Sequence, residues 1–224
     1  GTILVMIFMI VYYRFAGFIA NISLLINALI LIGAMAAYVS RGGMKLEAAL
    51  DAFRVNVNHK KAVDVGASTG GFTDCLLQHG AARVMAVDVG TNQLAYKLRV
   101  DPRVWVKENF NARYMTPSDL PDVPEVAVTD VSFISLKLIL PPIVDVLAPG
   151  GLIVALIKPQ FEAGKDKVGK KGVVRDPAVH LEVVEKILAL CKEINLTVWG
   201  LDFSPVKGPE GNIEFLISAE FFKK

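Results

Sequence analysis

The sequence predicts an α/β fold: a mostly parallel seven-stranded sheet with one antiparallel strand, preceded by an apolar helical segment. From residue 43 onward, short apolar runs alternate with amphipathic segments of helical length, which is typical of a parallel sheet covered by helices on both faces. The last two runs are joined by a turn without a helix, so we expect that pair to be antiparallel. The first 37 residues differ sharply in composition from the remainder.

The N-terminal 37 residues carry one charged side chain, Arg14, and 29 of them are apolar. The 21 residues from Phe15 to Met35 are long enough to span a bilayer at about 1.5 Å per residue. We therefore predict a transmembrane-like segment at residues 1–37 and membrane association through residues 3–36. A signal peptide is the alternative, because Ala34-Met35-Ala36 has the form of a cleavage site, although no basic residues precede the apolar stretch.

Residues 38–224 have the composition of one soluble domain and contain every charged side chain except Arg14. The net charge of the whole chain is +2, so an interaction with nucleic acid would have to depend on local clusters of basic residues. Two cysteines, Cys75 and Cys191, and three scattered histidines do not have the spacing of a zinc site, and we predict no bound metal.

The first half of this domain is predicted element by element from apolar periodicity. A helix at residues 43–53 has Leu46, Ala49, Leu50 and Phe53 at helical spacing. Residues 61–65 form a short apolar strand that runs into glycines, and a helix follows at residues 71–79. A second strand at residues 83–88 and a second helix at 92–99 complete the next unit, before strands at 104–107 and 126–130.

The second half continues the alternation and ends in a hairpin. Residues 135–147 are predicted as a helix and residues 152–157 as a strand. A long helix at residues 177–195 has an apolar face of Val179, Val183, Val184, Ile187, Leu188 and Cys191. The last two strands, at 197–203 and 213–221, lie on either side of residues 207–212, whose glycines, proline and asparagine indicate a turn.

A glycine-rich segment after the first predicted strand indicates a cofactor site. Glycines at this position let the backbone turn tightly and let a ligand approach it closely. Asp88, at the end of the next strand, follows Gly66 by 22 positions, which is close to the offset at which a carboxylate accepts both hydroxyls of a ribose. Both NAD and S-adenosylmethionine are bound by such a layout.

The spacing of the glycines favours S-adenosylmethionine over NAD. Gly66, Gly70 and Gly71 depart from the G-x-G-x-x-G pattern that places a helix N-terminus against pyrophosphate. Asp64 would repel a pyrophosphate but could attract the ammonium group of a methionine. We assign the cofactor site to Asp64, Gly66, Ser68, Thr69, Gly70, Gly71, Phe72 and Asp88, with a nicotinamide oxidoreductase as the alternative.

Four polar residues are expected to meet at one edge of the sheet. Asp130 and Lys158 end predicted strands, and Lys45 lies at the start of the first helix. Glu214 begins the antiparallel last strand, so it reaches the edge at which the parallel strands end. A lysine that closes an apolar strand is costly to bury unless it is paired, and the two carboxylates would pair it. An ordinary structural ion-pair network remains the alternative.

The same four residues suit methyl transfer to a ribose 2′-hydroxyl. This hydroxyl is a weak nucleophile, so a base must remove its proton as it attacks the methyl group, and a lysine can do so where burial and a second cation lower its pKa. In this interpretation Lys158 is the base, Lys45 is the neighbouring cation, and Asp130 and Glu214 orient the two lysines. The reaction needs no metal.

Several ordered motifs together resemble the TlyA family of FtsJ-like ribosomal RNA methyltransferases, whose members are also called haemolysins. These motifs are Ser40-Arg41-Gly42-Gly43, Lys45-Leu46, Asp64-Val65-Gly66-Ala67-Ser68-Thr69-Gly70-Gly71-Phe72, Ala86-Val87-Asp88, Asp130-Val131-Ser132-Phe133-Ile134-Ser135, Ile157-Lys158-Pro159-Gln160-Phe161-Glu162 and Gly172-Val173-Val174-Arg175-Asp176-Pro177. The resemblance extends from Tyr38 to the C-terminus.

The resemblance implies a Rossmann-like methyltransferase fold, S-adenosylmethionine as cofactor and a Lys-Asp-Lys-Glu tetrad at Lys45, Asp130, Lys158 and Glu214. It also implies that the substrate is a cytidine 2′-hydroxyl in ribosomal RNA or ribosomal subunits. Asn111 falls where the adenine is held, and Asp130 belongs to the cofactor site as well. Family members carry a small S4-type RNA-binding domain before the position of Tyr38, which we expect to be absent here because the apolar segment takes its place.

The apolar segment has a resemblance of its own. The stretch around Tyr12-Tyr13-Arg14-Phe15 and its continuation to Met35 resemble a transmembrane hairpin of the SecD and SecF protein-export subunits. We expect a cytoplasmic catalytic domain tethered to a membrane by this segment. A membrane-active, haemolysin-like protein is the alternative function, suggested by the segment and by the other name of the family.

A lysine-rich loop at residues 164–172 follows the predicted base. Its basic residues are Lys165, Lys167, Lys170 and Lys171, and glycines flank them. We predict that these lysines and Arg41 contact the RNA backbone, each phosphate contact steepening the dependence of binding on salt. A solvated mobile loop is the alternative, since the segment has no aromatic residue on which a base could stack.

Overall fold

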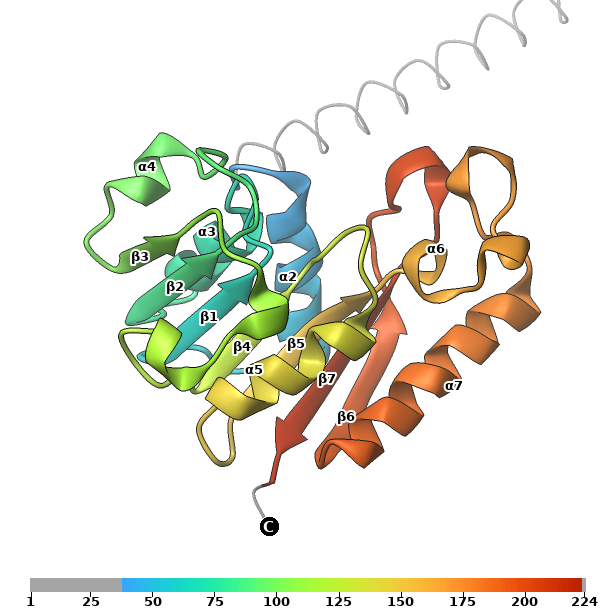
Figure 1. Ribbon diagram of the computed structural model, residues 1–224. Helices are drawn as coiled ribbons and strands as arrows, with labels where there is room; N and C mark the ends of the chain where they lie inside the picture. Colours follow the sequence, from blue (N-terminus) through green and yellow to red (C-terminus); the bar gives the residue numbers. More distant parts are fainter. Residues whose placement is uncertain (1–37, 223–224) are drawn as a thin grey trace, which may run out of the picture. The chain divides into compact units, whose positions relative to one another are not determined.

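The computed structural model describes residues 38–222, which form an α/β domain with one central sheet (Figure 1). The predicted transmembrane-like segment, residues 1–37, lies outside the described residues. Within residues 38–222, every helix is too short or too polar to cross a lipid bilayer.

The sheet has seven strands in the order β3-β2-β1-β4-β5-β7-β6. Pairing is parallel from β3 through β5, whereas β7 runs antiparallel to both β5 and β6. The predicted mostly parallel sheet with one antiparallel strand is confirmed. The strands are β1 (Lys61–Val65), β2 (Arg83–Val87), β3 (Val104–Lys107), β4 (Val126–Thr129), β5 (Leu152–Ile157), β6 (Leu196–Phe203) and β7 (Phe215–Phe221).

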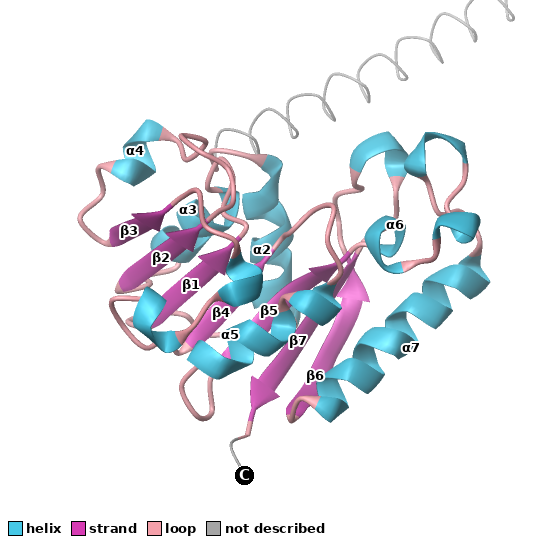
Figure 2. Cartoon of the chain, viewed as in Figure 1, coloured by secondary structure: helices cyan, strands magenta, loops and turns pink. Residues whose placement is uncertain are grey.

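Helices cover both faces of the sheet (Figure 2). They are α2 (Arg41–Ala52), α3 (Gly71–Gln78), α4 (Tyr96–Arg99), α5 (Leu140–Val146), α6 (Pro159–Glu162) and α7 (Pro177–Glu193). Alternate residues of a strand point to opposite faces. Val63 and Val65 of β1 pack in a core cluster with residues of α5 and α7, while Ala62 of the same strand packs in a second cluster with residues of α2 and α3.

Two of the predicted helices are shorter than the sequence pattern indicated. The predicted helix at residues 135–147 is a 3-10 turn at Leu136–Leu138 followed by α5. Pro141 and Pro142 explain the break, because a proline has no amide hydrogen to donate and is accommodated only in the first turn of a helix.

The predicted helix at residues 92–99 is reduced to α4, because backbone N–H groups at its start donate hydrogen bonds to the carboxylate of Glu108. The backbone N–H groups of Asn92 and Gln93 donate to the Glu108 carboxylate at 2.9 and 3.1 Å. Asn92 also has a left-handed backbone, with φ of 57°. The chain therefore turns before the helix begins at Tyr96.

The sheet topology fixes where a ligand can bind. Strand order reverses between β1 and β4, and in open α/β sheets the crevice at the carboxyl ends of the strands next to such a reversal is the usual binding site. The glycine-rich loop follows β1 and Asp130 follows β4, so the fold brings both predicted features to this point.

Candidate active site

The glycine-rich loop connects β1 to α3, and its shape depends on glycine at two positions. Gly66 and Gly70 have φ of +85° and +95°, in the left-handed region that disfavours other residues. A Cβ on Gly66 would lie 2.9 Å from a methyl group of Val131, and a Cβ on Gly70 would lie 2.3 Å from a methyl group of Leu98. The loop thus turns sharply and packs its backbone against the neighbouring segments.

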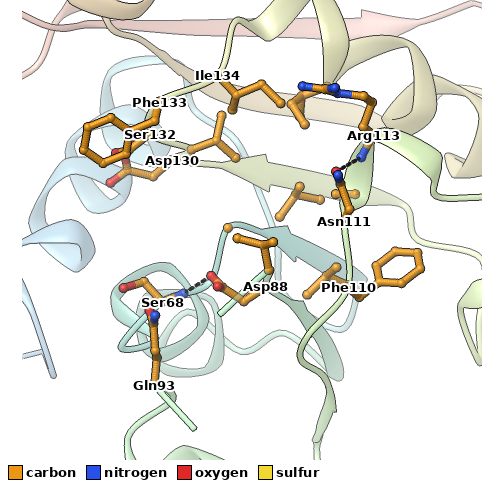
Figure 3. Close-up of a pocket in the computed structure, with 17 residues that line it drawn as sticks. Ser68, Asp88, Gln93, Phe110, Asn111, Arg113, Asp130, Ser132, Phe133 and Ile134 are labelled. Carbon is orange, nitrogen blue, oxygen red and sulfur yellow. Dashed lines mark hydrogen bonds between the residues drawn. The ribbon is translucent and has the colours of Figure 1, made fainter. Parts of the chain in front are cut away.

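Asp88 holds this loop through both of its carboxylate oxygens. One oxygen accepts a hydrogen bond from the backbone N–H of Ser68 at 2.7 Å, and the other accepts from the N–H of Gly90 at 2.6 Å. Asp88 also faces the cavity in Figure 3. A carboxylate oxygen can accept more than one hydrogen bond, so these contacts leave Asp88 able to bind ribose hydroxyls.

A cavity of about 500 Å³ opens beside the loop, within the size range of cofactor sites. Its wall combines apolar side chains with a few polar ones: Val65, Gly66, Ser68, Val87, Asp88, Val89, Gln93, Phe110, Asn111, Ala112, Arg113, Asp130, Val131, Ser132, Phe133, Ile134 and Ile139. Asn111 lies on this wall, where its side-chain oxygen accepts a hydrogen bond from the backbone N–H of Arg113 at 3.1 Å. Its contact with an adenine remains a prediction.

A smaller cavity of about 200 Å³ adjoins the first and contains the remaining loop residues. Its lining consists of Ser40, Gly42, Gly66, Ala67, Ser68, Thr69, Gly71, Phe72, Asp130, Ser132 and Lys158. Eight of the ten predicted cofactor residues therefore line one or both cavities, and Asp64 and Gly70 line neither. Gly70 shapes the loop, and the contact of Asp64 with a methionine ammonium group stays a prediction.

Asp64 is buried beneath the loop and is incompletely paired. One carboxylate oxygen accepts a hydrogen bond from the hydroxyl of Thr73 at 2.7 Å, and the other has no hydrogen-bond partner. Burial raises the pKa of Asp64 to about 7, against the lowering effect of the Thr73 hydrogen bonds.

This raised pKa predicts a pH-dependent loss of stability. Between about pH 4 and pH 7 the folded chain holds a proton on Asp64 that the unfolded chain has released, so the free energy of unfolding falls as the pH rises through this range and levels off above it. From this group alone, the free energy of unfolding should fall by roughly 4 kcal/mol between the two ends of the range. Urea unfolding of the wild type and of Asp64→Asn across this range measures it. Parallel curves for the two proteins would contradict the prediction.

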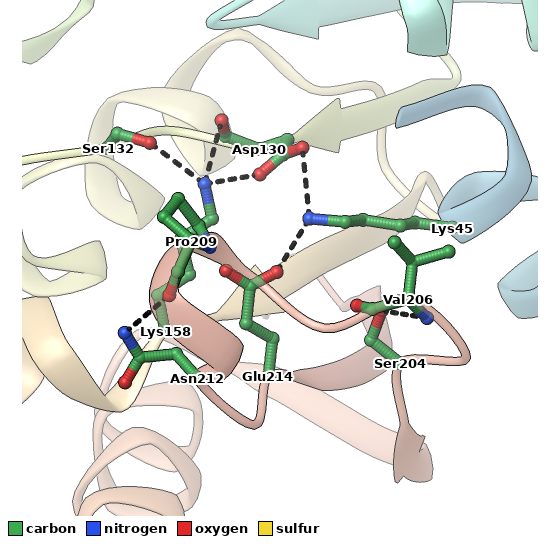
Figure 4. A network of polar contacts seen from close by, with 9 residues as sticks. All are labelled: Lys45, Asp130, Ser132, Lys158, Ser204, Val206, Pro209, Asn212 and Glu214. Carbon is green, nitrogen blue, oxygen red and sulfur yellow. Dashed lines mark hydrogen bonds and ion pairs between the residues drawn. The ribbon is translucent and has the colours of Figure 1, made fainter. Parts of the chain in front are cut away.

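The four residues of the predicted tetrad lie together in one network of polar contacts (Figure 4). Lys45 Nζ lies 2.6 Å from Glu214 Oε2 and 3.9 Å from Asp130 Oδ2. Lys158 Nζ lies 2.5 Å from Asp130 Oδ1. Asp130 thus lies between the two lysines, and the structure brings all four residues together.

Strand register explains why residues 158 and 214 meet although they are far apart in the chain. Ile157 of β5 is paired with Phe215 of the antiparallel β7, so Lys158 leaves one strand beside the point where Glu214 enters the other. The side chain of Glu214 is fully buried, and those of the two lysines are about nine-tenths buried. Two lysines and two carboxylates give the group no net charge, which makes its burial tolerable.

Lys158 forms an ion pair with the Asp130 carboxylate and donates two hydrogen bonds. The acceptors are the Ser132 hydroxyl at 2.9 Å and the backbone carbonyl of Asp130 at 3.4 Å. These contacts hold the Lys158 nitrogen at a fixed place beside the glycine-rich loop. Ser132 was missed by the sequence reasoning, although it stands two residues after Asp130 in a quoted motif.

Glu162 is a second residue that sequence reasoning missed. It lies in α6, four residues after Lys158, and its carboxylate accepts hydrogen bonds from the Ser135 hydroxyl at 2.6 Å and from the Leu136 backbone N–H at 2.7 Å. Burial raises the pKa of Glu162 despite these contacts. The bonds tie the segment after β5 to the segment after β4, which carries Asp130. The signal in the sequence was an acid shortly after the lysine, without an obvious partner.

Substitution of Glu162 should therefore loosen the active site. We expect Glu162→Ala to lower the free energy of unfolding by about 2–3 kcal/mol, because it leaves a hydroxyl and a backbone amide without an acceptor. Methyl transfer should fall as well, since the distance between Asp130 and Lys158 is no longer fixed. Urea unfolding and transfer assays measure the two effects. Glu162→Gln, which keeps an acceptor oxygen, should lose less, and equal losses in both variants would contradict this account.

Asn212 supports Glu214 from within the turn before β7. Its side-chain oxygen accepts from the N–H of Val174 at 3.1 Å, and its amide group donates to the carbonyls of Gly172 and Pro209, each at 3.0 Å. The end of the lysine-rich loop is thereby joined to the turn that carries Glu214.

The lysine-rich loop itself forms two 3-10 turns, at Lys165–Lys167 and Lys170–Gly172. Lys167 is paired with Glu182 of α7, so this side chain is engaged within the domain. Lys165, Lys170 and Lys171 are exposed, as is Arg41. Their contact with RNA stays a prediction.

The fold and the site define a class of enzyme. A cavity at the strand reversal, with a carboxylate after β2, a glycine-rich turn after β1 and apolar walls, suits the ribose, the amino-acid part and the adenine of S-adenosylmethionine. These are the features of an S-adenosylmethionine-dependent methyltransferase. Residues 38–221 match the model of the FtsJ-like methyltransferases, and the chain belongs to that family.

Individual relatives agree with this assignment. Over 181 residues the chain is 56% identical to the Bacillus subtilis protein YqxC, covering 80% of this chain and 64% of that protein. It is 46% identical to the 16S/23S rRNA (cytidine-2′-O)-methyltransferase TlyA of Mycobacterium tuberculosis, covering 81% of this chain and 68% of the relative. The chain thus spans about two thirds of the length of these relatives.

Solved structures give the same fold. The crystal structure of a hemolysin-type protein from Lactococcus lactis superposes with a TM-score of 0.80 at 52% identity, over 82% of this chain and 88% of that one. An S-adenosylmethionine-dependent methyltransferase from Mesorhizobium loti has a TM-score of 0.54 at 16% identity, over 79% and 97% of the two chains, and shares the fold. The predicted methyltransferase fold and cofactor class are confirmed.

A separate similarity concerns a short stretch. Over 38 residues, the chain is 55% identical to the protein translocase subunit SecD of Calditerrivibrio nitroreducens, which is 17% of this chain and 7% of that protein. SecD is the protein that residues 3–36 were predicted to resemble.

Proposed function

We propose that this chain transfers the methyl group of S-adenosylmethionine to a ribose 2′-hydroxyl of ribosomal RNA, with a cytidine as the target nucleotide. The observation that carries the proposal is the buried network of Lys45, Asp130, Lys158 and Glu214 next to the cofactor cavity. The names of the relatives support the substrate, since one is a 16S/23S rRNA (cytidine-2′-O)-methyltransferase.

In this proposal Lys158 is the general base. When bound, S-adenosylmethionine supplies an electrophilic methyl group on a sulfonium. As the 2′-hydroxyl takes up this methyl group, it would pass its proton to the Lys158 amine. Two hydrogen-bond acceptors and the paired Asp130 carboxylate surround that nitrogen, and they stabilise the ammonium that results. Asp130 orients Lys158, and Glu214 holds Lys45 beside Asp130.

An exposed aromatic residue supports a nucleoside substrate. Phe133 is 90% exposed, lies on the rim of the cofactor cavity and has a left-handed backbone with φ of 62°. Its ring lies near that of Phe161, with the ring centroids 5.0 Å apart and the planes tilted by 49°. Sequence-specific RNA recognition commonly stacks unpaired bases on such aromatic faces. We propose that the base of the target nucleotide stacks on Phe133.

The experiment is methyl transfer from radiolabelled S-adenosylmethionine to isolated small and large ribosomal subunits, followed by mass spectrometry of the nucleosides. The expected product is 2′-O-methylcytidine. Methylation of a base, or no transfer to either subunit, would contradict the proposal. The same assay without residues 1–37 shows whether the apolar segment contributes.

The alternative of a membrane-active protein predicts a different pattern. Lysis of erythrocytes would persist in Lys158→Ala and disappear without residues 1–37, because it would depend on the apolar segment and not on the tetrad. Tethering of a cytoplasmic catalytic domain through residues 3–36 is a separate proposal, checked by flotation of the chain with liposomes.

A further inference from the structure

A third cavity, of about 220 Å³, is lined by Lys45 of the tetrad. It is formed by the start of α2 and by the turn before β7: Ser40, Arg41, Gly42, Lys45, Val206, Lys207, Gly208 and Pro209 line it. Ser40 and Gly42 also line the cavity that contains Asp130 and Lys158. The third cavity is therefore continuous with the tetrad.

Two unpaired cations give this cavity a positive charge. Within the tetrad the two lysines are balanced by two carboxylates, so the tetrad itself attracts no anion. Arg41 and Lys207 are exposed, and within residues 38–222 neither forms an ion pair or a side-chain hydrogen bond. Glu210, in the same turn, does not line the cavity.

The start of α2 adds hydrogen-bond donors on the same wall. The N-cap residue Ser40 makes no side-chain hydrogen bond to the first turn of this 12-residue helix. Amide hydrogens in the first turn of a helix have no acceptor within the helix, and they favour anions. Gly42 brings this backbone to the cavity without a side chain in the way.

The chemistry of RNA requires an anion close to the reacting hydroxyl. In a polynucleotide the 2′-hydroxyl is on the carbon next to the one that carries the 3′-phosphodiester. A ribose that presents its hydroxyl to Lys158 therefore brings a phosphodiester near the tetrad. We propose that the third cavity binds a backbone phosphodiester next to the target ribose, with Arg41 and Lys207 as its ligands. This inference rests on the proposed function and adds Lys207 to the RNA site.

The test measures how RNA binding depends on salt. Anisotropy of a labelled single-stranded oligoribonucleotide is followed from low to high salt for the wild type, Arg41→Gln, Lys207→Gln and the double variant. Each substitution should weaken binding by roughly tenfold and reduce the slope of log K against log salt by about 0.7–0.9. Lys192→Gln is the matched control. It removes an exposed lysine in the last turn of α7, which does not line the third cavity, and it should leave the slope unchanged.

The outcomes separate this inference from the proposed function. Slopes for Arg41→Gln and Lys207→Gln that equal the control slope would overturn the phosphate site, even if the wild type methylates ribosomal RNA. Reduced slopes in a wild type that transfers no methyl group would support the site and overturn the proposed function. Arg41→Lys keeps the charge and should keep most of the slope, and thermal melting shows whether each variant is folded.

Discussion

Lys158→Ala and Lys158→Arg should both lose methyl transfer, by about 10²- to 10⁴-fold in kcat, if Lys158 is the general base. The alanine variant lacks the side-chain amine that would accept the proton. Arginine keeps the positive charge and the hydrogen-bond donors, but its guanidinium does not give up a proton in this pH range and cannot accept one from a hydroxyl. Single-turnover transfer to ribosomal RNA measures the chemical step directly.

The comparison between the two variants decides the role of the residue. Both should still bind S-adenosylhomocysteine in calorimetry, because Lys158 lines only the smaller cavity and is not among the predicted cofactor residues. Lys192→Ala is the control, as it removes an exposed lysine far from the tetrad. If the arginine variant kept most of the activity, Lys158 would act through its charge and a different group would take the proton.

Asp88→Ala should weaken binding of S-adenosylhomocysteine by at least about 100-fold. Two hydrogen bonds from ribose hydroxyls to a carboxylate contribute about 1.5–3 kcal/mol each, and the same substitution frees the glycine-rich loop by removing the acceptor of Ser68 and Gly90. Titration calorimetry measures the dissociation constant, and Asp145→Ala, at an exposed position on α5, serves as the control.

Asp88→Asn refines this prediction because it keeps one acceptor oxygen. Its affinity for S-adenosylhomocysteine should lie between that of the wild type and that of Asp88→Ala. Calorimetry with NAD on the wild type tests the rival cofactor. Binding of NAD without binding of S-adenosylhomocysteine would overturn the assignment, as would an affinity in Asp88→Ala equal to that of the control.

The sequence pattern was sufficient for the sheet and for the four residues of the tetrad. The central strands β1, β2, β4 and β5 are short and mostly apolar, and Asp130 and Lys158 follow directly after β4 and β5, so parallel pairing alone brings these two residues to one edge. Glu214 could be placed beside them because the composition of residues 207–212 indicates a turn, which makes the last two strands antiparallel. These features are local in the chain and follow from periodicity.

Other features depend on contacts between distant residues, which periodicity does not contain. The helix expected at residues 92–99 is shortened because the backbone N–H of Asn92 donates to the Glu108 carboxylate. The sequence around Asn92 gives no sign of this contact. In the same way, Glu162 and Asn212 bind backbone groups of other loops. Asp64 is almost fully buried and lines neither cavity, and its place two residues before Gly66 in the sequence does not indicate this burial.

The position of β7 has a consequence for the synthesis of the chain. This last strand inserts between β5 and β6, and the residue just before it completes the tetrad. While the chain is still emerging from the ribosome, the edges of β5 and β6 therefore have no neighbour, and exposed strand edges of this kind favour aggregation. A nascent chain would hold the glycine-rich loop long before it holds Glu214. The four residues of the tetrad therefore come together only once β7 has paired with β5 and β6.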